Sequence, residues 1–253
     1  MEQKSKYLVF GNYNYNPIIK VNNENVSRCD SAVYLGHLLH TRNTTKEIIE
    51  HAIKEFKKSY YGFISRFESC YNSTKNKLFH QYCCSMYGSQ LWDKTSTTIE
   101  NMYTQWRKAH RQVLSVPYMT HCDLLPLIAD NMPLEYILDS RYFAFFKSIV
   151  NSENEIISHL ASSRIFDCSS ALGRNITHLM CKYDLVIDDM LSLSKQKIKN
   201  HCLNKWMSGI KVEYPMYAQI IKDMILMKEG NDPSIFTINE CNCIIDFCSI
   251  TNE

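Results

Sequence analysis

The feature that most constrains this chain is a change in the spacing of its apolar residues near residue 44. Before it, short β-prone runs at residues 7–10, 18–21 and 32–35 are separated by Gly, Asn and Pro. After it, apolar residues recur at steps of three and four, the spacing of one helix face. They are Ile49, Ile53, Phe56, Tyr60, Phe63 and Phe67. The chain is therefore predicted to be mainly α-helical, with a small antiparallel β element at its N-terminus.

Further stretches of helical spacing follow along the chain. We expect helices at residues 44–67, 74–91, 97–115, 133–149, 171–183, 194–208, 215–229 and from Thr237 onward. Only 7 Gly and 6 Pro occur, which argues against a turn-rich all-β barrel. A Ser- and Asn-rich stretch at residues 151–170 is the best candidate for a domain boundary. We therefore expect three parts, at residues 1–42, 43–150 and 151–253.

Composition bears on whether the chain crosses a membrane and on the compartment in which it folds. No run approaches 18 apolar residues, so no transmembrane helix is expected, and the first ten residues lack a signal-peptide pattern. Cysteine is abundant, with 11 residues, an odd number. Without a secretory signal these are expected to be reduced thiols of an intracellular protein, cytoplasmic or nuclear.

Charge is distributed unevenly between the two halves of the chain. Residues 1–120 contain 16 Lys/Arg and 9 Asp/Glu, a net charge of +7, whereas residues 121–253 have a net charge of −5. A basic front half is able to contact phosphates, and an acidic rear half is not.

One predicted helix carries a basic edge that suits nucleic acid. Arg107, Lys108 and Arg111 share one edge of the helix at residues 97–115, next to Trp106. Such an edge can grip a phosphate backbone by charge and a base by stacking. The alternative is a solvated helix face with Trp106 buried in the core.

Two other patterns in the sequence resemble metal sites. Asp188 and Asp189 stand between apolar pairs, as in a two-carboxylate Mg²⁺ site, but two exposed acids at a helix start is the favoured interpretation. Candidate zinc ligands occur in two groups. These are His178, Cys181, His201 and Cys202, then Cys241, Cys243 and Cys248. Their spacing favours packed thiols, so no metal site is predicted.

Known nucleotide-binding and hydrolase motifs do not occur in the sequence. It contains no Gly-x-x-x-x-Gly-Lys-Ser/Thr loop, no Gly-x-Gly-x-x-Gly and no Gly-x-Ser-x-Gly. These motifs therefore give no catalytic residue.

Four stretches in order resemble the downstream part of a non-long-terminal-repeat (LINE-type, jockey-like) retrotransposon reverse transcriptase. They are residues 4–11 (KSKYLVFG), 33–36 (VYLG), 77–92 and 106–127. In that family the first resembles a lysine-bearing palm strand and the second the primer-grip strand, while the others resemble the thumb and the helical connector. The resemblance implies palm-edge strands at residues 1–42, thumb-like helices at 43–150 and further helices at 151–253.

The same resemblance implies a set of nucleic-acid contacts. The lysines would lie near the phosphates of the incoming nucleotide, the Tyr-Leu-Gly strand near the primer 3′ end, and the helix edge on the template–primer backbone. The residues so implicated are Lys4, Lys6, Tyr34, Leu35, Gly36, Trp106, Arg107, Lys108 and Arg111.

The catalytic Asp motifs of the family precede the segment that begins at Lys4. We therefore expect a fragment of an RNA-directed DNA polymerase that is not an enzyme by itself and has no cofactor, with Mg²⁺ used only by the full-length relative. Its expected partners are RNA or an RNA–DNA hybrid, bound weakly and without sequence preference, and the missing upstream portion. The rival hypothesis is a helical interaction or scaffold protein with no nucleic-acid role.

Overall fold

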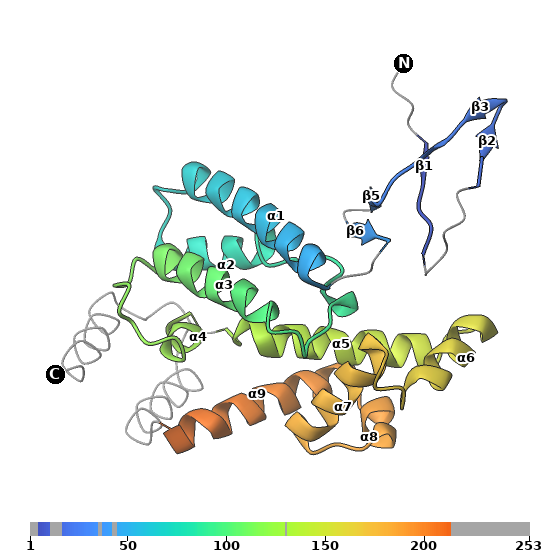
Figure 1. Cartoon of the computed structure of the whole chain (residues 1–253). Helices are drawn as coiled ribbons and strands as arrows, with labels where there is room; N and C mark the ends of the chain where they lie inside the picture. The colour runs from blue at the N-terminus through green and yellow to red at the C-terminus, as the bar shows by residue number, and fades with distance from the viewer. Residues whose placement is uncertain (1–4, 11–16, 35–36, 42–44, 130, 214–253) are drawn as a thin grey trace.

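The computed structural model describes residues 5–10, 17–34, 37–41, 45–129 and 131–213. Short strands come first and helices follow, so the prediction of a mainly α-helical fold with a small N-terminal β element is confirmed. In Figure 1 the strands within residues 6–28 stand away from the helices, whereas the strand at residues 37–40 lies beside the first helix. The predicted helices at 215–229 and from Thr237 lie outside the described residues.

The strands form three separate two-stranded ladders. In chain order they are β1 (Lys6–Tyr7), β2 (Lys20–Val21), β3 (Glu24–Asn25), β4 (Ser27–Arg28), β5 (Ser31–Tyr34) and β6 (His37–His40). Two ladders are antiparallel as predicted, but β1 pairs with β4 in parallel. Positive φ angles at Asn22 and Asn23 close the β2–β3 hairpin, because Asn tolerates the left-handed region that such a two-residue turn requires.

The helices pack into one body. They are α1 (Thr45–Arg66), α2 (Asn72–Tyr82), the 3₁₀ turn η1 (Ser89–Leu91), α3 (Ile99–Leu114), α4 (Leu124–Ile128), α5 (Leu134–Val150), α6 (Glu155–Arg164), α7 (Ala171–Tyr183), α8 (Ile187–Ser192) and α9 (Lys195–Glu213). The bounds of α7 are those predicted from the sequence. Helix α6 lies within residues 151–170, the stretch expected to be a boundary.

A first hydrophobic cluster, here called the front cluster, joins α1, α2 and α3. The predicted stripe of α1 supplies buried Phe56, Tyr60 and Phe63, whose rings surround Phe79 of α2 at centroid distances of 6.1–6.2 Å. Burial of each such side chain stabilises the fold by about 1.5–3 kcal/mol. The apolar spacing read from the sequence thus places α1 correctly.

A second hydrophobic cluster, the rear cluster, joins α5, α7, α8 and α9. Helix α5 belongs to both clusters, since Leu134 and Leu138 pack in the front cluster and Phe143 and Phe146 in the rear one. One helix therefore runs through both cores. The predicted division at residue 150 falls at its C-terminal end and stays a prediction.

The segment predicted as one helix at residues 74–91 is two elements. Helix α2 ends at Tyr82, and the chain reverses through left-handed backbone at Met86 (φ 40°) and Gly88 (φ 74°) before η1. Buried side chains of this connection, Cys83, Cys84 and Met86, fill the front cluster. The helix prediction was wrong here because apolar residues that pack from a loop gave the same spacing as a helix face.

Strand β6 contacts the helical body where the chain makes this reversal. The ring of His37 packs against that of Tyr87 in a tilted arrangement, with centroids 4.7 Å apart. A Cβ atom at Gly88 would lie 1.1 Å from His37 Cε1. Glycine is thus required at position 88 both for its positive φ and for the close approach of the hairpin.

We expect Gly88→Ala to lower the free energy of unfolding by about 1–3 kcal/mol, since alanine is strained at this φ and displaces His37. Urea unfolding followed by circular dichroism measures it. Gly62→Ala within α1, where an added Cβ meets no atom within 4 Å, is the matched control and should be neutral or stabilising. Equal effects of both changes would contradict this role of Gly88.

Candidate functional site

The structure places Trp106 in the front cluster, where it is 2% exposed. Its indole Nε1 donates to Cys84 Sγ at 3.3 Å, and its ring lies 4.6 Å from the ring of His110. A buried ring has no face available to a base. Of the two interpretations of Trp106, a ring that stacks on a base or a ring buried in the core, the structure therefore supports the second.

The three cations of the α3 edge have different environments. Arg107 lies 3.7 Å from Glu100, and Lys108 is exposed to solvent. Arg111 is half-buried, and its guanidinium donates two hydrogen bonds to the carbonyl oxygen of Thr120, at 3.0 and 2.8 Å. Of these three, Lys108 presents its charge most openly, whereas Arg111 holds the chain that follows α3.

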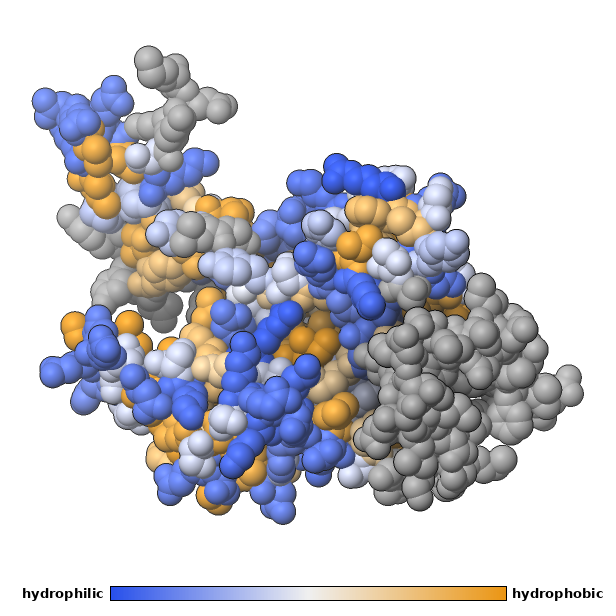
Figure 2. All heavy atoms as spheres, turned by 180° about the vertical axis from the view of Figure 1, so that it is seen from behind, coloured by the Kyte–Doolittle hydropathy of each residue, from blue (hydrophilic) through white to orange (hydrophobic). Residues whose placement is uncertain are grey.

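The strand residues predicted to bind nucleic acid are only partly described. Lys6 is exposed on β1, and Tyr34 is 65% exposed at the end of β5. Lys4, Leu35 and Gly36 lie outside the described residues. Figure 2 shows apolar side chains on the surface of the strands, in keeping with exposed Ile18 and Val21 among them.

A cation and aromatic stripe lies on the outward face of α1. Lys54, Lys58 and Tyr61 recur at steps of four and three, so they share one side of the helix, opposite much of the buried stripe. All three are exposed, and Tyr61 is 65% exposed. Lys58 is 3.9 Å from Glu55, a solvent-exposed pair that contributes little. From the sequence, Lys54, Lys57, Lys58 and Arg66 form a basic edge that is more often plain solvent surface, and nothing there singles out the tyrosine among them.

A small cleft separates β6 from the helical body. It encloses about 150 Å³ and is lined by His37, His51, Glu55, Tyr87 and Trp92, among others. Its polar groups come from β6, α1 and the reversal before η1. The cleft is too small for a nucleotide, because ligand pockets are commonly several hundred Å³.

The most buried charges form a network that sequence reasoning missed. Asp139 of α5 accepts hydrogen bonds from Lys94 at 2.5 Å, from Lys182 at 2.6 Å and from the hydroxyl of Tyr183 at 2.8 Å. Lys182 also contacts Glu135. The side chains of Lys94 and Asp139 are 3% and 2% exposed. Two cations facing two carboxylates leave this interior site neutral.

The pKa of Asp139 shows which effect dominates in this network. Burial raises the pKa of a carboxyl group, but the ammonium groups of Lys94 and Lys182 outweigh burial and hold the pKa of Asp139 below its usual value. For Lys182 burial lowers the pKa, and Asp139 with Glu135 raises it above its usual value. Both groups stay charged at neutral pH, which favours a structural role over proton transfer.

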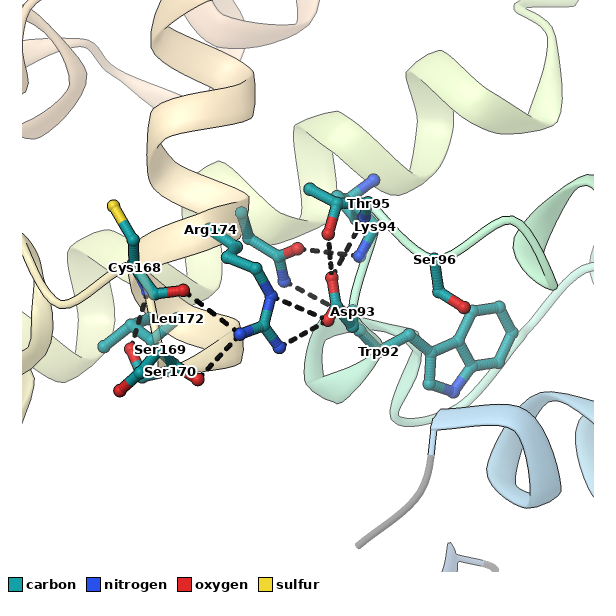
Figure 3. A network of polar contacts seen from close by, with 12 residues as sticks. Trp92, Asp93, Lys94, Thr95, Ser96, Cys168, Ser169, Ser170, Leu172 and Arg174 are labelled. Atoms are coloured by element: carbon teal, nitrogen blue, oxygen red, sulfur yellow. Dashed lines mark hydrogen bonds and ion pairs between the residues drawn. The ribbon is translucent and has the colours of Figure 1, made fainter.

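A second polar group extends the network to the surface (Figure 3). Asp93, in the turn after η1, accepts hydrogen bonds from Arg174 at 3.0 and 2.6 Å and from the Thr95 hydroxyl at 2.6 Å. Arg174 also donates to the carbonyl oxygens of Cys168 and Ser169. The turn at residues 92–95 is thus bonded to α5 and to α7, which ties the front cluster to the rear one.

The carboxylate pair predicted at a helix start is found there. Asp188 and Asp189 are exposed in the first turn of α8, where the helix dipole stabilises negative charge. This is the favoured interpretation of the two acids.

The zinc candidates do not converge within the described part of the chain. No group of three or more His, Cys, Asp or Glu side chains there could hold a metal ion. His178 and Cys181 are exposed, while Cys202 is buried in the rear cluster. Cys241, Cys243 and Cys248 lie outside the described residues.

Comparison with known proteins gives no relative. No protein-family model matches the chain, and no curated protein or solved structure is significantly similar to it. In the described residues, no helix combines the length and the apolar character that crossing a membrane requires.

Two neutral histidines lie against the aromatic rings of the front cluster, His110 buried and His80 half-buried beside it. Burial lowers the pKa of His80 to about 4, and burial together with His80 lowers that of His110 to about 3. His110 Nε2 lies 3.0 Å from Asn76 Oδ1, which can only accept, so this nitrogen carries the proton. His80 Nε2 has no hydrogen-bond partner. Protonation of either ring would place a charge inside the core.

We expect the free energy of unfolding to fall as the pH falls from about 6.5 to about 4. Over this range the unfolded chain protonates both imidazoles while the folded protein keeps them neutral, so the unfolded state binds more protons. His80→Leu should reduce the slope of stability against pH by about one proton, or about 1.4 kcal/mol per pH unit.

Urea unfolding between pH 4.5 and 6 measures this slope. His159→Leu, at an exposed position of α6, is the control and should leave the slope unchanged. An unchanged slope in His80→Leu would contradict a neutral His80 in the folded protein.

Proposed function

We propose that this protein binds RNA or an RNA–DNA hybrid, without sequence preference, through the helices α1 to α3. The observation that carries the proposal is the exposed stripe of Lys54, Lys58 and Tyr61 along α1. Lysines at this spacing can follow successive phosphates, and an exposed ring between them offers a face to a base.

Exposed tyrosines also favour the front half of the molecule as the binding surface. Among the described residues, six tyrosines are more than half exposed, and these lie within residues 34–118, in the half with the net charge of +7. They are Tyr34, Tyr61, Tyr71, Tyr82, Tyr87 and Tyr118. Aromatic rings interspersed with cations are typical of surfaces that bind single strands.

We further propose that the chain derives from a non-long-terminal-repeat retrotransposon reverse transcriptase and binds without polymerising. In support, short strands at residues 6–40 precede a helical bundle, the order that the resemblance implies. In this proposal α1 to α3 correspond to a thumb. Lys108 is the α3 cation best exposed to contact a backbone phosphate.

A second candidate function is an interaction protein without a nucleic-acid role. The observation in its favour is an apolar face on α6, where Ile156 and Leu160 are 70% and 55% exposed, followed by Phe166 at 80%. An exposed apolar face on a helix is typical of protein–protein contacts.

Fluorescence anisotropy of a labelled RNA–DNA hybrid at low and moderate salt tests the proposal. We expect binding that weakens with salt, because bound phosphates release counterions. Replacing Lys54, Lys57 and Lys58 together by Glu should weaken binding at least about tenfold at low salt, since six units of charge change on one face.

The matched control replaces Lys195, Lys197 and Lys199 of α9 by Glu, the same charge change on the rear half. It should weaken binding much less. Equal losses in both triple variants, or no binding by the unchanged protein, would overturn the proposal, and primer extension above a mock preparation with Mg²⁺ and dNTPs would overturn the non-polymerising role.

A further inference from the structure

A tight turn after α3 presents two exposed side chains. The amide of Thr120 donates to the carbonyl of Pro117 at 3.0 Å, which closes the turn. Tyr118 and Met119 at its tip are 83% and 60% exposed, whereas Thr120 is buried. The two tip residues therefore project from a turn whose base is packed against the protein.

Arg111 fixes this turn on the end of α3. Its Nε and Nη2 atoms both donate to the Thr120 carbonyl, at 3.0 and 2.8 Å, and Nη2 also lies 3.1 Å from Cys122 Sγ. The planar guanidinium makes such paired hydrogen bonds in one orientation, which a lysine cannot reproduce. The position of Tyr118 relative to α3 is thus set by Arg111.

A second exposed tyrosine lies at the same end of the α2–α3 pair. Tyr71 precedes the first residue of α2 and is 83% exposed. The next residue, Asn72, donates from Nδ2 to the carbonyl of Leu114, the last residue of α3, at 3.2 Å. Figure 1 shows the start of α2 and the loop after α3 at one end of the bundle.

We propose that Tyr71 and Tyr118 form a stacking platform for unpaired bases of a nucleic-acid strand, with Arg111 as the positioning residue of Tyr118. The inference rests on the proposed function and adds the place where the protein contacts bases. Base stacking needs an aromatic ring whose face is open and whose position is fixed. The turn after α3 and the start of α2 each supply one such ring. Arg111, predicted as a phosphate contact, acts here through the turn.

Neighbouring charges favour nucleic acid over an apolar protein segment. Lys75 lies one helical turn from Tyr71, and Lys108 lies one turn before Arg111 on the same edge of α3. Both can reach the phosphates of a strand whose bases stack on the rings. The acids closest in sequence are Glu68 and Asp123, and Asp123 is 3.4 Å from His121.

Anisotropy with two hybrids of equal duplex length, one blunt and one with a single-stranded RNA overhang, tests the platform. A blunt duplex keeps its bases stacked on each other, so we expect the overhang to bind more tightly. Tyr118→Ala should weaken binding of the overhang ligand about fivefold or more and change blunt binding little, and Tyr118→Phe should bind as the unchanged protein does. A DNA overhang of the same length tells whether the platform distinguishes the two sugars.

Two further variants separate the platform from general effects. Phe166→Ala, which removes an exposed ring after α6 on the rear half, should leave the preference for the overhang unchanged. Arg111→Lys keeps the charge but loses the paired hydrogen bonds, so it should reduce the overhang preference while blunt binding persists.

The outcomes distinguish the two proposals. If the unchanged protein binds neither ligand, the proposed function fails and the platform with it. If it binds both ligands equally, or if Tyr118→Ala behaves like Phe166→Ala, the platform is wrong and the proposed function stands.

Discussion

The buried carboxylate of Asp139 is the interaction on which the rest of this fold depends. It lies on α5, the one described helix shared by both hydrophobic clusters. It accepts hydrogen bonds from Lys94, in the turn after η1, and from Lys182 and Tyr183 of α7. Buried charges are costly unless each has a partner. Among the described residues, Lys94 pairs with Asp139 alone, and Lys182 pairs with Asp139 and Glu135, so separating the front and rear clusters would leave a buried charge without a partner.

This constraint explains why the front half can present a fixed surface. The turn at residues 92–95 is anchored by Lys94 and Asp93, so the start of α3 is held against α5 and α7. At the other end of α3, Arg111 anchors the turn that carries Tyr118. Apolar and buried ionic contacts therefore form the inside of the front half, while exposed lysines and tyrosines remain on its outside, where the proposed nucleic acid would contact them.

Sequence patterns predicted the long helices, because helix spacing is a local property, and the stripe of α1 and the bounds of α7 follow from that spacing directly. The same patterns missed the short helices α4 and α6. The patterns also failed at residues 83–92, where buried Cys84 and Trp92 pack from an irregular segment. The pairing of Asp139 with Lys94 joins residues 45 positions apart, so no local pattern could show it. One signal was present, since Asp139 shares a helix face with the apolar Tyr142 and Phe146.

Hydrogen exchange of the Asp139→Asn variant tests the central claim, that one buried carboxylate holds both clusters together as one unit. We predict that Asp139→Asn lowers the free energy of unfolding by about 3–5 kcal/mol, with protection falling equally in α1–α3 and in α7–α9. Removing the three most buried of the four charges together (Lys94→Met, Asp139→Leu, Lys182→Met) should cost less than the single change. Protection that falls in α7–α9 alone, with α1–α3 unchanged, would contradict the account.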